Sequence, residues 1–121
     1  MSFPAIKWDL YVQAGSWDPQ YITLTDPDTG EPLDLTAPGF SVHGVVATRT
    51  DGQGDILADL PDNSVWRRTT TGRLYFEPDP DLTSTWTFRR GFHQVEITHP
   101  VGRPVRIAAG LVLVSPELVL T

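Results

Sequence analysis

The chain has 121 residues, enough for one domain, and it contains no cysteine, which excludes disulfides, thiolate metal sites and a cysteine nucleophile. Its formal net charge of −6 argues against nucleic-acid binding, because that binding depends on basic side chains that displace counterions from phosphates. The sequence shows no secretory signal and no apolar stretch as long as a membrane helix, so we expect one soluble domain over residues 1–121 that contacts no membrane.

Prolines and glycines divide the chain into short segments. The 11 prolines and 10 glycines gather in clusters about ten residues apart, a spacing typical of the turns between short strands. The segments between them are rich in β-branched and aromatic residues or alternate polar with apolar residues. In chain order, the predicted strands are residues 8–12, 21–24, 40–48, 55–60, 65–69, 73–77, 92–98 and 105–115.

Only residues 79–86 can hold a turn of helix, with Asp79, Asp81 or Thr83 as its N-cap. The pattern therefore predicts an all-β protein: an antiparallel β-sandwich, immunoglobulin-like or jelly-roll-like, with about seven to nine strands and at most one short helix. The last predicted strand has apolar residues on both faces, so we expect it to be central or partly covered. One face carries Val105, Ile107, Ala109, Leu111 and Leu113, and the other carries Ala108, Val112 and Val114.

The stretch DPDTGEPLDLT, residues 26–36, holds four acidic side chains, two prolines and a glycine. Its first residues match the start of a calcium loop, but the EF-hand positions that need a ligand, a glycine and a glutamate hold Gly30, Glu31 and Ala37. The alternative is a turn, in which Pro27 presets φ, aspartates bond nearby amides and Gly30 takes a positive φ. We favour the turn. Calcium held by carboxylates from separate loops stays open at this stage.

The histidines, serines and carboxylates do not show the sequence spacing of a known catalytic or metal site. His43, His93 and His99 form no zinc motif, and no serine lies in a nucleophile elbow. Glu77 and Asp79 are paired carboxylates of the kind that glycosidases use, but the flanking prolines favour a solvated turn. We expect no enzyme, no catalytic residue, no metal site and no cofactor.

The four tryptophans have two interpretations. Trp8, Trp17, Trp66 and Trp86 are able to stack on sugars, as in carbohydrate-binding modules, or to fill a small β core. Arginines follow Trp66 directly and follow Trp86 after two residues, and this combination suits a protein interface at least as well as a sugar site.

Several fragments together resemble a known group of proteins. They are KWDLYVQAGSWDPQYITLTDPDTGEPLDLT, FSVHGVVATR, TTGRLYFEPDPDLTSTWTFRRGFHQVEIT and PVGRPVRIAAGLVLVSPELV. In order and spacing they resemble small structural proteins of tailed bacteriophages, especially phages of actinobacteria, with an LtfC-type β-sandwich domain related to the N-terminal domain of upper baseplate proteins. The chain departs from that pattern at Phe92, where a tyrosine is expected, and after Thr36, where Ala-Pro-Gly follows.

The resemblance implies a virion structural protein of the tail, baseplate or neck, assembled in the host cytoplasm in multiple copies with other phage structural proteins. It supplies no catalytic residue. Subunits of symmetric assemblies act through edges and extensions, so residues 1–7 and 116–121 are predicted docking extensions, unless they seal the ends of their own sandwich. The predicted contacts are Phe3, Ile6, Trp8, Leu118, Val119 and Leu120. A receptor- or carbohydrate-binding module of the adhesion apparatus is the alternative.

Overall fold

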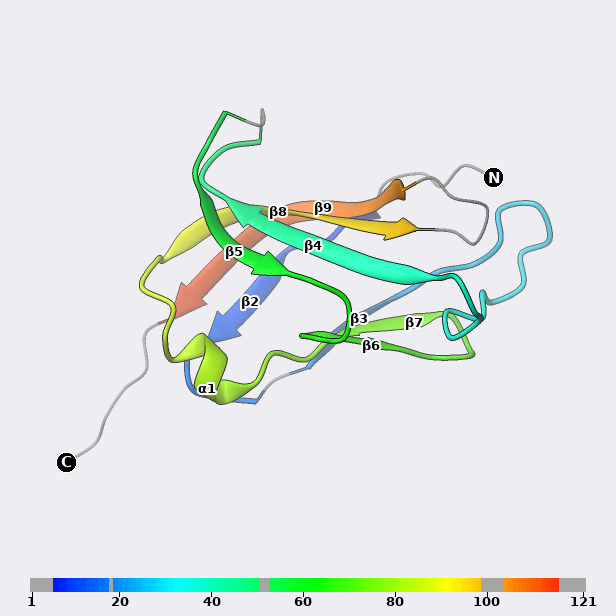
Figure 1. Ribbon diagram of the computed structural model, residues 1–121, viewed down its shortest axis with the longest axis horizontal. Helices are drawn as coiled ribbons and strands as arrows, with labels where there is room; N and C mark the ends of the chain where they lie inside the picture. Colours follow the sequence, from blue (N-terminus) through cyan, green and yellow to red (C-terminus); the bar gives the residue numbers. More distant parts are fainter. Residues whose placement is uncertain (1–5, 18, 51–52, 99–103, 116–121) are drawn as a thin grey trace.

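The computed structural model describes residues 6–17, 19–50, 53–98 and 104–115. They form two layers of β-strands and one short helix, which confirms the predicted all-β sandwich (Figure 1). The predicted strands and the observed ones agree within a few residues, apart from the first. The elements are β1 (Ile6–Lys7), β2 (Leu10–Gln13), β3 (Gln20–Thr23), β4 (Ser41–Ala47), β5 (Ile56–Leu60), β6 (Trp66–Arg68), β7 (Arg73–Phe76), α1 (Pro80–Thr83), β8 (Arg90–Thr98) and β9 (Pro104–Ser115).

The larger layer is a six-stranded sheet in the order β1-β9-β8-β4-β5, with β2 also paired to β9. The pairs β9–β8, β8–β4 and β4–β5 are antiparallel. The pairs of β1 and β2 with β9 are parallel, so the predicted antiparallel sandwich carries two parallel strand pairs at this edge. Because β9 has neighbours on both sides, it lies inside the sheet, as its two apolar faces predicted.

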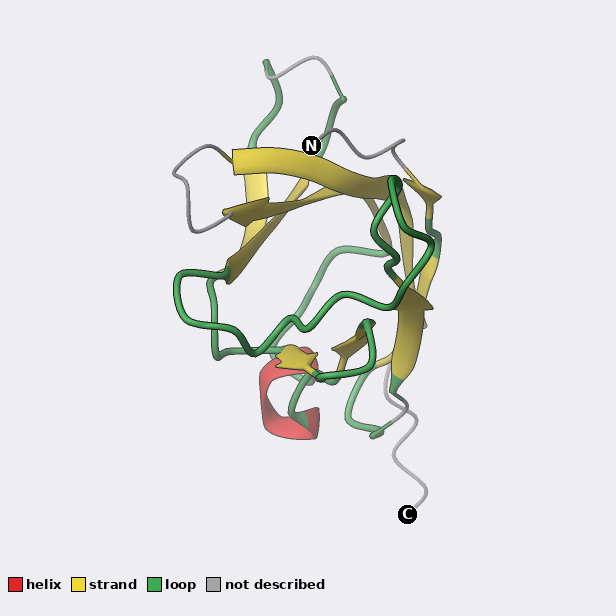
Figure 2. Cartoon of the chain, turned by 90° about the vertical axis from the view of Figure 1, so that its right-hand side faces the viewer, coloured by secondary structure: helices red, strands yellow, loops and turns green. Residues whose placement is uncertain are grey.

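The smaller layer is a three-stranded antiparallel sheet in the order β3-β7-β6. Turned by 90°, the molecule shows the strongly curved larger sheet, with α1 at the lower end of the view (Figure 2). Helix α1 has Asp79 as its N-cap, one of the three candidates, and the Asp79 carboxylate accepts a hydrogen bond from the Asp81 amide at 2.8 Å. The Thr83 hydroxyl in turn accepts one from the Gly15 amide at 3.0 Å, which holds the helix against the turn after β2.

The core fills the space between the layers, because alternate residues of each strand point inward. Leu10, Leu74, Phe76, Val95 and Val112 are each at most 1% exposed. On β9 the inward set is Ile107, Ala108, Val112 and Val114, because a bulge opposite Val95 and Glu96 changes the alternation. Ala109, Leu111 and Leu113, which were expected to share a face with Ile107, therefore lie on the outside of the sheet.

In place of the single predicted strand at residues 8–12, the structure has two short strands, β1 and β2, which are separated by Trp8 and Asp9. The Trp8 carbonyl oxygen accepts a hydrogen bond from Nε2 of the buried His93, and the Asp9 carboxylate accepts one from the Leu111 amide at 3.0 Å. Gly110 makes this break possible. A Cβ on Gly110 would meet the Trp8 carbonyl oxygen and would lie 2.7 Å from its carbonyl carbon.

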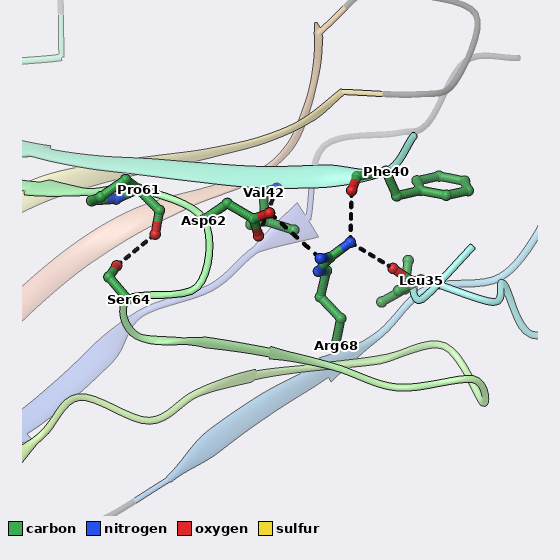
Figure 3. A network of polar contacts seen from close by, with 7 residues as sticks. All are labelled: Leu35, Phe40, Val42, Pro61, Asp62, Ser64 and Arg68. Carbon is green, nitrogen blue, oxygen red and sulfur yellow. Dashed lines mark hydrogen bonds and ion pairs between the residues drawn. The ribbon is translucent and has the colours of Figure 1, made fainter. Parts of the chain in front are cut away.

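Arg68 joins the two sheets. From β6 its guanidinium donates hydrogen bonds to the carbonyl oxygens of Leu35 (3.0 Å) and Phe40 (2.6 Å), and its Nη2 lies 3.4 Å from the Asp62 carboxylate (Figure 3). The same carboxylate accepts a hydrogen bond from the Val42 amide of β4 at 3.3 Å. The connection into β4 is thus held to the smaller sheet by one charged group.

Candidate protein-contact surfaces

The predicted contact residues fall into two groups. Phe3, Leu118, Val119 and Leu120 lie outside the described residues. Ile6 packs against the core and Trp8 is 7% exposed, so the side chains of both are already engaged within the chain. This is the placement that the self-sealing alternative expects for the N-terminal strand. A role of these six residues in assembly stays a prediction.

The acidic stretch is a turn, as favoured from the sequence. Thr25 and Pro32 form an antiparallel bridge, and the Asp26 carboxylate accepts a hydrogen bond from the Asp28 amide at 2.8 Å. Gly30 has a φ of 73°, the left-handed conformation that favours glycine. We call residues 25–32 the acidic hairpin.

The segment after the acidic hairpin also follows its prediction. Leu35 is buried and Leu33 is half-buried, while Asp34 and Thr36 are exposed. The Thr36 hydroxyl and amide both donate hydrogen bonds to the Asp34 carboxylate, and these bonds lower the pKa of Asp34. This stretch is a connector, in which the inward leucines fix the position of the hairpin that precedes them.

The candidate chemical groups have local partners. The Glu77 carboxylate accepts a hydrogen bond from Arg67 Nε at 2.9 Å, and Asp79 caps α1. His43 lies on the outer face of β4, 2.5 Å from the Asp59 carboxylate, and His99 lies outside the described residues. Within the described ranges, no three histidine, aspartate or glutamate side chains gather where a metal ion would fit. In the same ranges, no helix is long and apolar enough to cross a membrane.

The tryptophans do not share one face. Trp8 and Trp66 are buried, with ring centroids 6.2 Å apart, and Trp86 stacks on Phe88 at 5.2 Å. Trp17 is 63% exposed. The sequence left open whether the tryptophans form a sugar-stacking platform or fill the core. Two of them, Trp8 and Trp66, belong to the core.

The outer face of the smaller sheet carries a Tyr–Arg cluster, which we define as Tyr21, Tyr75, Arg67 and Arg73. The two tyrosine rings are opposite each other on β3 and β7, with centroids 5.2 Å apart. The Arg67 guanidinium lies 3.9 Å above the Tyr75 ring, and that of Arg73 lies 4.6 Å from the Tyr21 ring. A hydrogen bond from Arg73 is the main cause of a lowered pKa at Tyr75. Such mutual contacts hold exposed side chains in place before any partner binds.

The sequence analysis missed this cluster, although a signal was present. It placed Leu74 and Phe76 on one face of their strand, so Arg73 and Tyr75 had to lie on the other. Tyrosine and arginine are enriched in protein interfaces and dominate their binding energy.

The outer face of the larger sheet carries a hollow of about 610 Å³, which we call the cationic groove. Its floor includes a row of side chains from four neighbouring strands, since Leu111 pairs with Phe92, Phe92 with Ala47, and Ala47 with Ile56. A second row is Ala109, Gln94 and Val45. The basic residues Lys7, Arg49, Arg90 and Arg106 line the groove together with one acidic residue, Asp9. These four basic residues lie far apart in the sequence, and the fold brings them together here.

Beneath the groove, His93 is 1% exposed and its Nδ1 atom has no hydrogen-bond partner. With Nε2–H donated to the Trp8 carbonyl, Nδ1 is the unprotonated nitrogen. Burial lowers the pKa of His93 from the ordinary value of 6.5. The neutral imidazole is therefore the form that the folded protein accommodates.

We expect acid to destabilise the protein through His93. Above about pH 6.5 the side chain is neutral in both states, whereas below it the unfolded chain takes up a proton that the folded chain resists. The free energy of unfolding should therefore fall as the pH drops below about 6.5, by at most about 1.4 kcal/mol per pH unit for one proton. His93→Gln, which keeps a donor but does not titrate, should remove this part of the dependence. Urea unfolding of both proteins between about pH 5 and 7.5 tests this, and parallel profiles would refute it.

Comparison with known proteins leaves the family open. No protein-family model matches the chain, and no curated protein is significantly similar to it. Among solved structures, the N-terminal domain of phage TP901-1 ORF48 aligns with a TM-score of 0.44 and 12% identity over 95% of this chain and 99% of that one. Extracellular domains 3–5 of Drosophila OTK align with a TM-score of 0.36 and 15% identity, over 96% of this chain and 34% of that one. At this level of similarity neither structure identifies a function or a partner.

Proposed function

We propose that this chain is a non-enzymatic structural subunit that acts through protein–protein contacts, as a tail, baseplate or neck component of a tailed phage. The observation that carries the protein-contact role is the Tyr–Arg cluster. Its four large side chains stand on the outer face of a sheet and contact one another through a tilted aromatic pair and two cation–π contacts. The phage setting rests on the resemblance in sequence order and spacing.

The cluster has the features of a binding hot spot. Tyr21 is 50% exposed, and its ring contacts both the Tyr75 ring and the Arg73 guanidinium, so a partner would meet an ordered aromatic surface. Aromatic side chains with few rotatable bonds lose little entropy when they bind. Truncation of such residues typically costs 2 kcal/mol or more of binding free energy, which is about a 30-fold loss of affinity.

We expect the chain to be present in purified phage particles and to depend on this cluster for its place there. Particles produced with the double variant Tyr21→Ala and Tyr75→Ala should contain far fewer copies of the chain than wild-type particles, as measured by quantitative mass spectrometry. Tyr21 is exposed and Tyr75 is half-buried on the outer face of the sheet, so the variant should remain folded. Tyr11→Ala, which removes a 57% exposed tyrosine from the larger sheet, is the matched control and should leave the copy number unchanged.

Two results would contradict the proposal. Absence of the chain from wild-type particles would exclude a virion component, and an unchanged copy number in the double variant would exclude the cluster as its contact. Binding of the purified protein to host cell-wall glycans that is lost in Trp17→Ala would instead favour the adhesion module.

A further inference from the structure

The basic charge of the cationic groove is largely unpaired. In the described part of the chain, no carboxylate lies within ion-pair distance of Lys7, Arg90 or Arg106, and the ion pairs found there involve other basic residues. Among the described residues that line the groove, Asp9 is the one with a carboxylate, and this group accepts a hydrogen bond from the Leu111 amide at 3.0 Å. In a chain of net charge −6, Lys7, Arg90 and Arg106 around one hollow are a local reversal of sign.

The floor of the groove is apolar and only partly covered. Phe92 and Leu111 are half-buried, and Ile56 is 61% exposed. The Arg90 guanidinium lies 5.7 Å from the centre of the Phe92 ring, so charge and apolar surface are next to each other. A ligand that fits this site carries negative charge beside small apolar groups, because it has to satisfy both parts of the surface.

The acidic hairpin has that composition. Asp28 and Glu31 are exposed and, among the described residues, face no basic partner, while Pro27 and Pro32 add exposed apolar surface. The hairpin is rigid, because the Asp26 amide donates to the Glu31 carbonyl and the Gly30 amide to the Asp26 carbonyl, both at 2.8 Å. The Leu33 and Leu35 amides donate to Leu24 and Thr69 and fix the base of the projection. A projection held in this way loses little entropy on docking.

The hairpin and the groove lie in different parts of the molecule. None of the residues that line the groove comes from residues 25–32. In Figure 1 the hairpin projects at the right-hand end, whereas the segments 48–50 and 53–55, the first of which belongs to the groove lining, rise at the upper left. A contact between these two surfaces therefore joins two different molecules.

We propose that the cationic groove binds the acidic hairpin of a second copy of this chain. The contact is head-to-tail, so each subunit offers a groove to one neighbour and a hairpin to the other, and repetition gives a closed ring or a filament. Complementary charge sets the register of this contact, and salt weakens it because the charges are exposed. The inference rests on the proposed function, for which it names a second copy as one of the partners.

Charge exchange tests the contact on the full chain. The groove variant is Arg90→Glu with Arg106→Glu, and the hairpin variant is Asp28→Lys with Glu31→Lys; all four side chains are exposed. Sedimentation velocity up to about millimolar protein should show self-association of the wild type that weakens with salt. Each variant alone should lose about tenfold or more in affinity per reversed charge. An equimolar mixture of the two variants should associate again, because each groove then meets a hairpin of opposite sign.

Two control variants change charge elsewhere. Gln13→Glu adds negative charge on β2 and Asp81→Lys reverses the charge on α1. Neither position lines the groove or belongs to the hairpin, so both variants should associate like the wild type. A wild type that is monomeric at every concentration, a variant mixture that fails to associate, or an equal loss in either control variant would each overturn this proposal. The first two of these results would leave the proposed function intact, because its test is the presence of the chain in particles and the role of the two tyrosines.

Discussion

Gly110→Ala is expected to destabilise the protein by about 3 kcal/mol or more, because the new methyl group has no space that side-chain movement can provide. An added Cβ would meet the carbonyl oxygen of Trp8 and would lie 2.7 Å from Asp9 Oδ1. Both belong to the segment between β1 and β2, so the methyl group has to push this edge of the sheet away from β9. The hydrogen bonds from His93 to Trp8 and from Leu111 to Asp9 would be lost with it.

The measurement is the free energy of unfolding in urea, with the thermal midpoint as a second reading. For a domain of this size, 3 kcal/mol corresponds to a fall of about 12 °C in the midpoint. Gly30→Ala is the matched control. Nothing lies within 4 Å of its added Cβ, and the cost comes only from its φ of 73°, about 1–2 kcal/mol. If Gly110→Ala is no more destabilising than Gly30→Ala, the Trp8 backbone does not approach β9 as closely as the structure shows.

Arg68→Met is the second change with a large expected effect, again a loss of about 3 kcal/mol. Methionine keeps most of the length and apolar surface of the side chain but donates no hydrogen bond. Leu35 and Phe40 then each lose a charged donor to their carbonyl oxygens, and Asp62 loses the cation that lies 3.4 Å away. Hydrogen bonds to charged groups contribute about 1.5–3 kcal/mol each, more than neutral ones.

Arg67→Met is the control on the neighbouring residue. The Arg67 side chain is 52% exposed and pairs with Glu77 on the surface, so we expect a much smaller loss than in Arg68→Met. Arg68→Lys adds a second comparison: it keeps the charge but cannot reach both carbonyls with a planar fork, so its stability should lie between those of the wild type and Arg68→Met. Urea unfolding measures all three. Equal losses in Arg67→Met and Arg68→Met would show that Arg68 does not join the sheets.

Features set by neighbouring residues were readable from the sequence. The apolar alternation predicted strands that agree with β3 to β9 within a few residues, and Asp79 was one of three predicted N-cap candidates for α1. The turn at residues 26–30 and the inward direction of Leu35 were also predicted. Each of these depends on contacts within a few positions, where side-chain size, φ preference and local hydrogen bonds decide the outcome.

Both candidate surfaces depend on the order of the strands. The Tyr–Arg cluster needs Tyr21 opposite Tyr75, 54 positions later in the chain, and the groove row needs the register that places Phe92 between Leu111 and Ala47. Alternation indicates which face a residue occupies, but it does not indicate which strand lies beside it. For this reason the sequence located the arginines and aromatic residues without grouping them.

The sequence by itself determined that this is a β-sandwich of short strands with an acidic turn and a capped helical turn, because these features arise from local preferences. Only the tertiary structure decided that the first strands run parallel to β9, that Trp8 is buried against His93, and that basic residues from β1, β8, β9 and the loop after β4 surround one apolar groove. These outcomes join residues up to about a hundred positions apart, and they are set by how the whole chain buries its apolar surface.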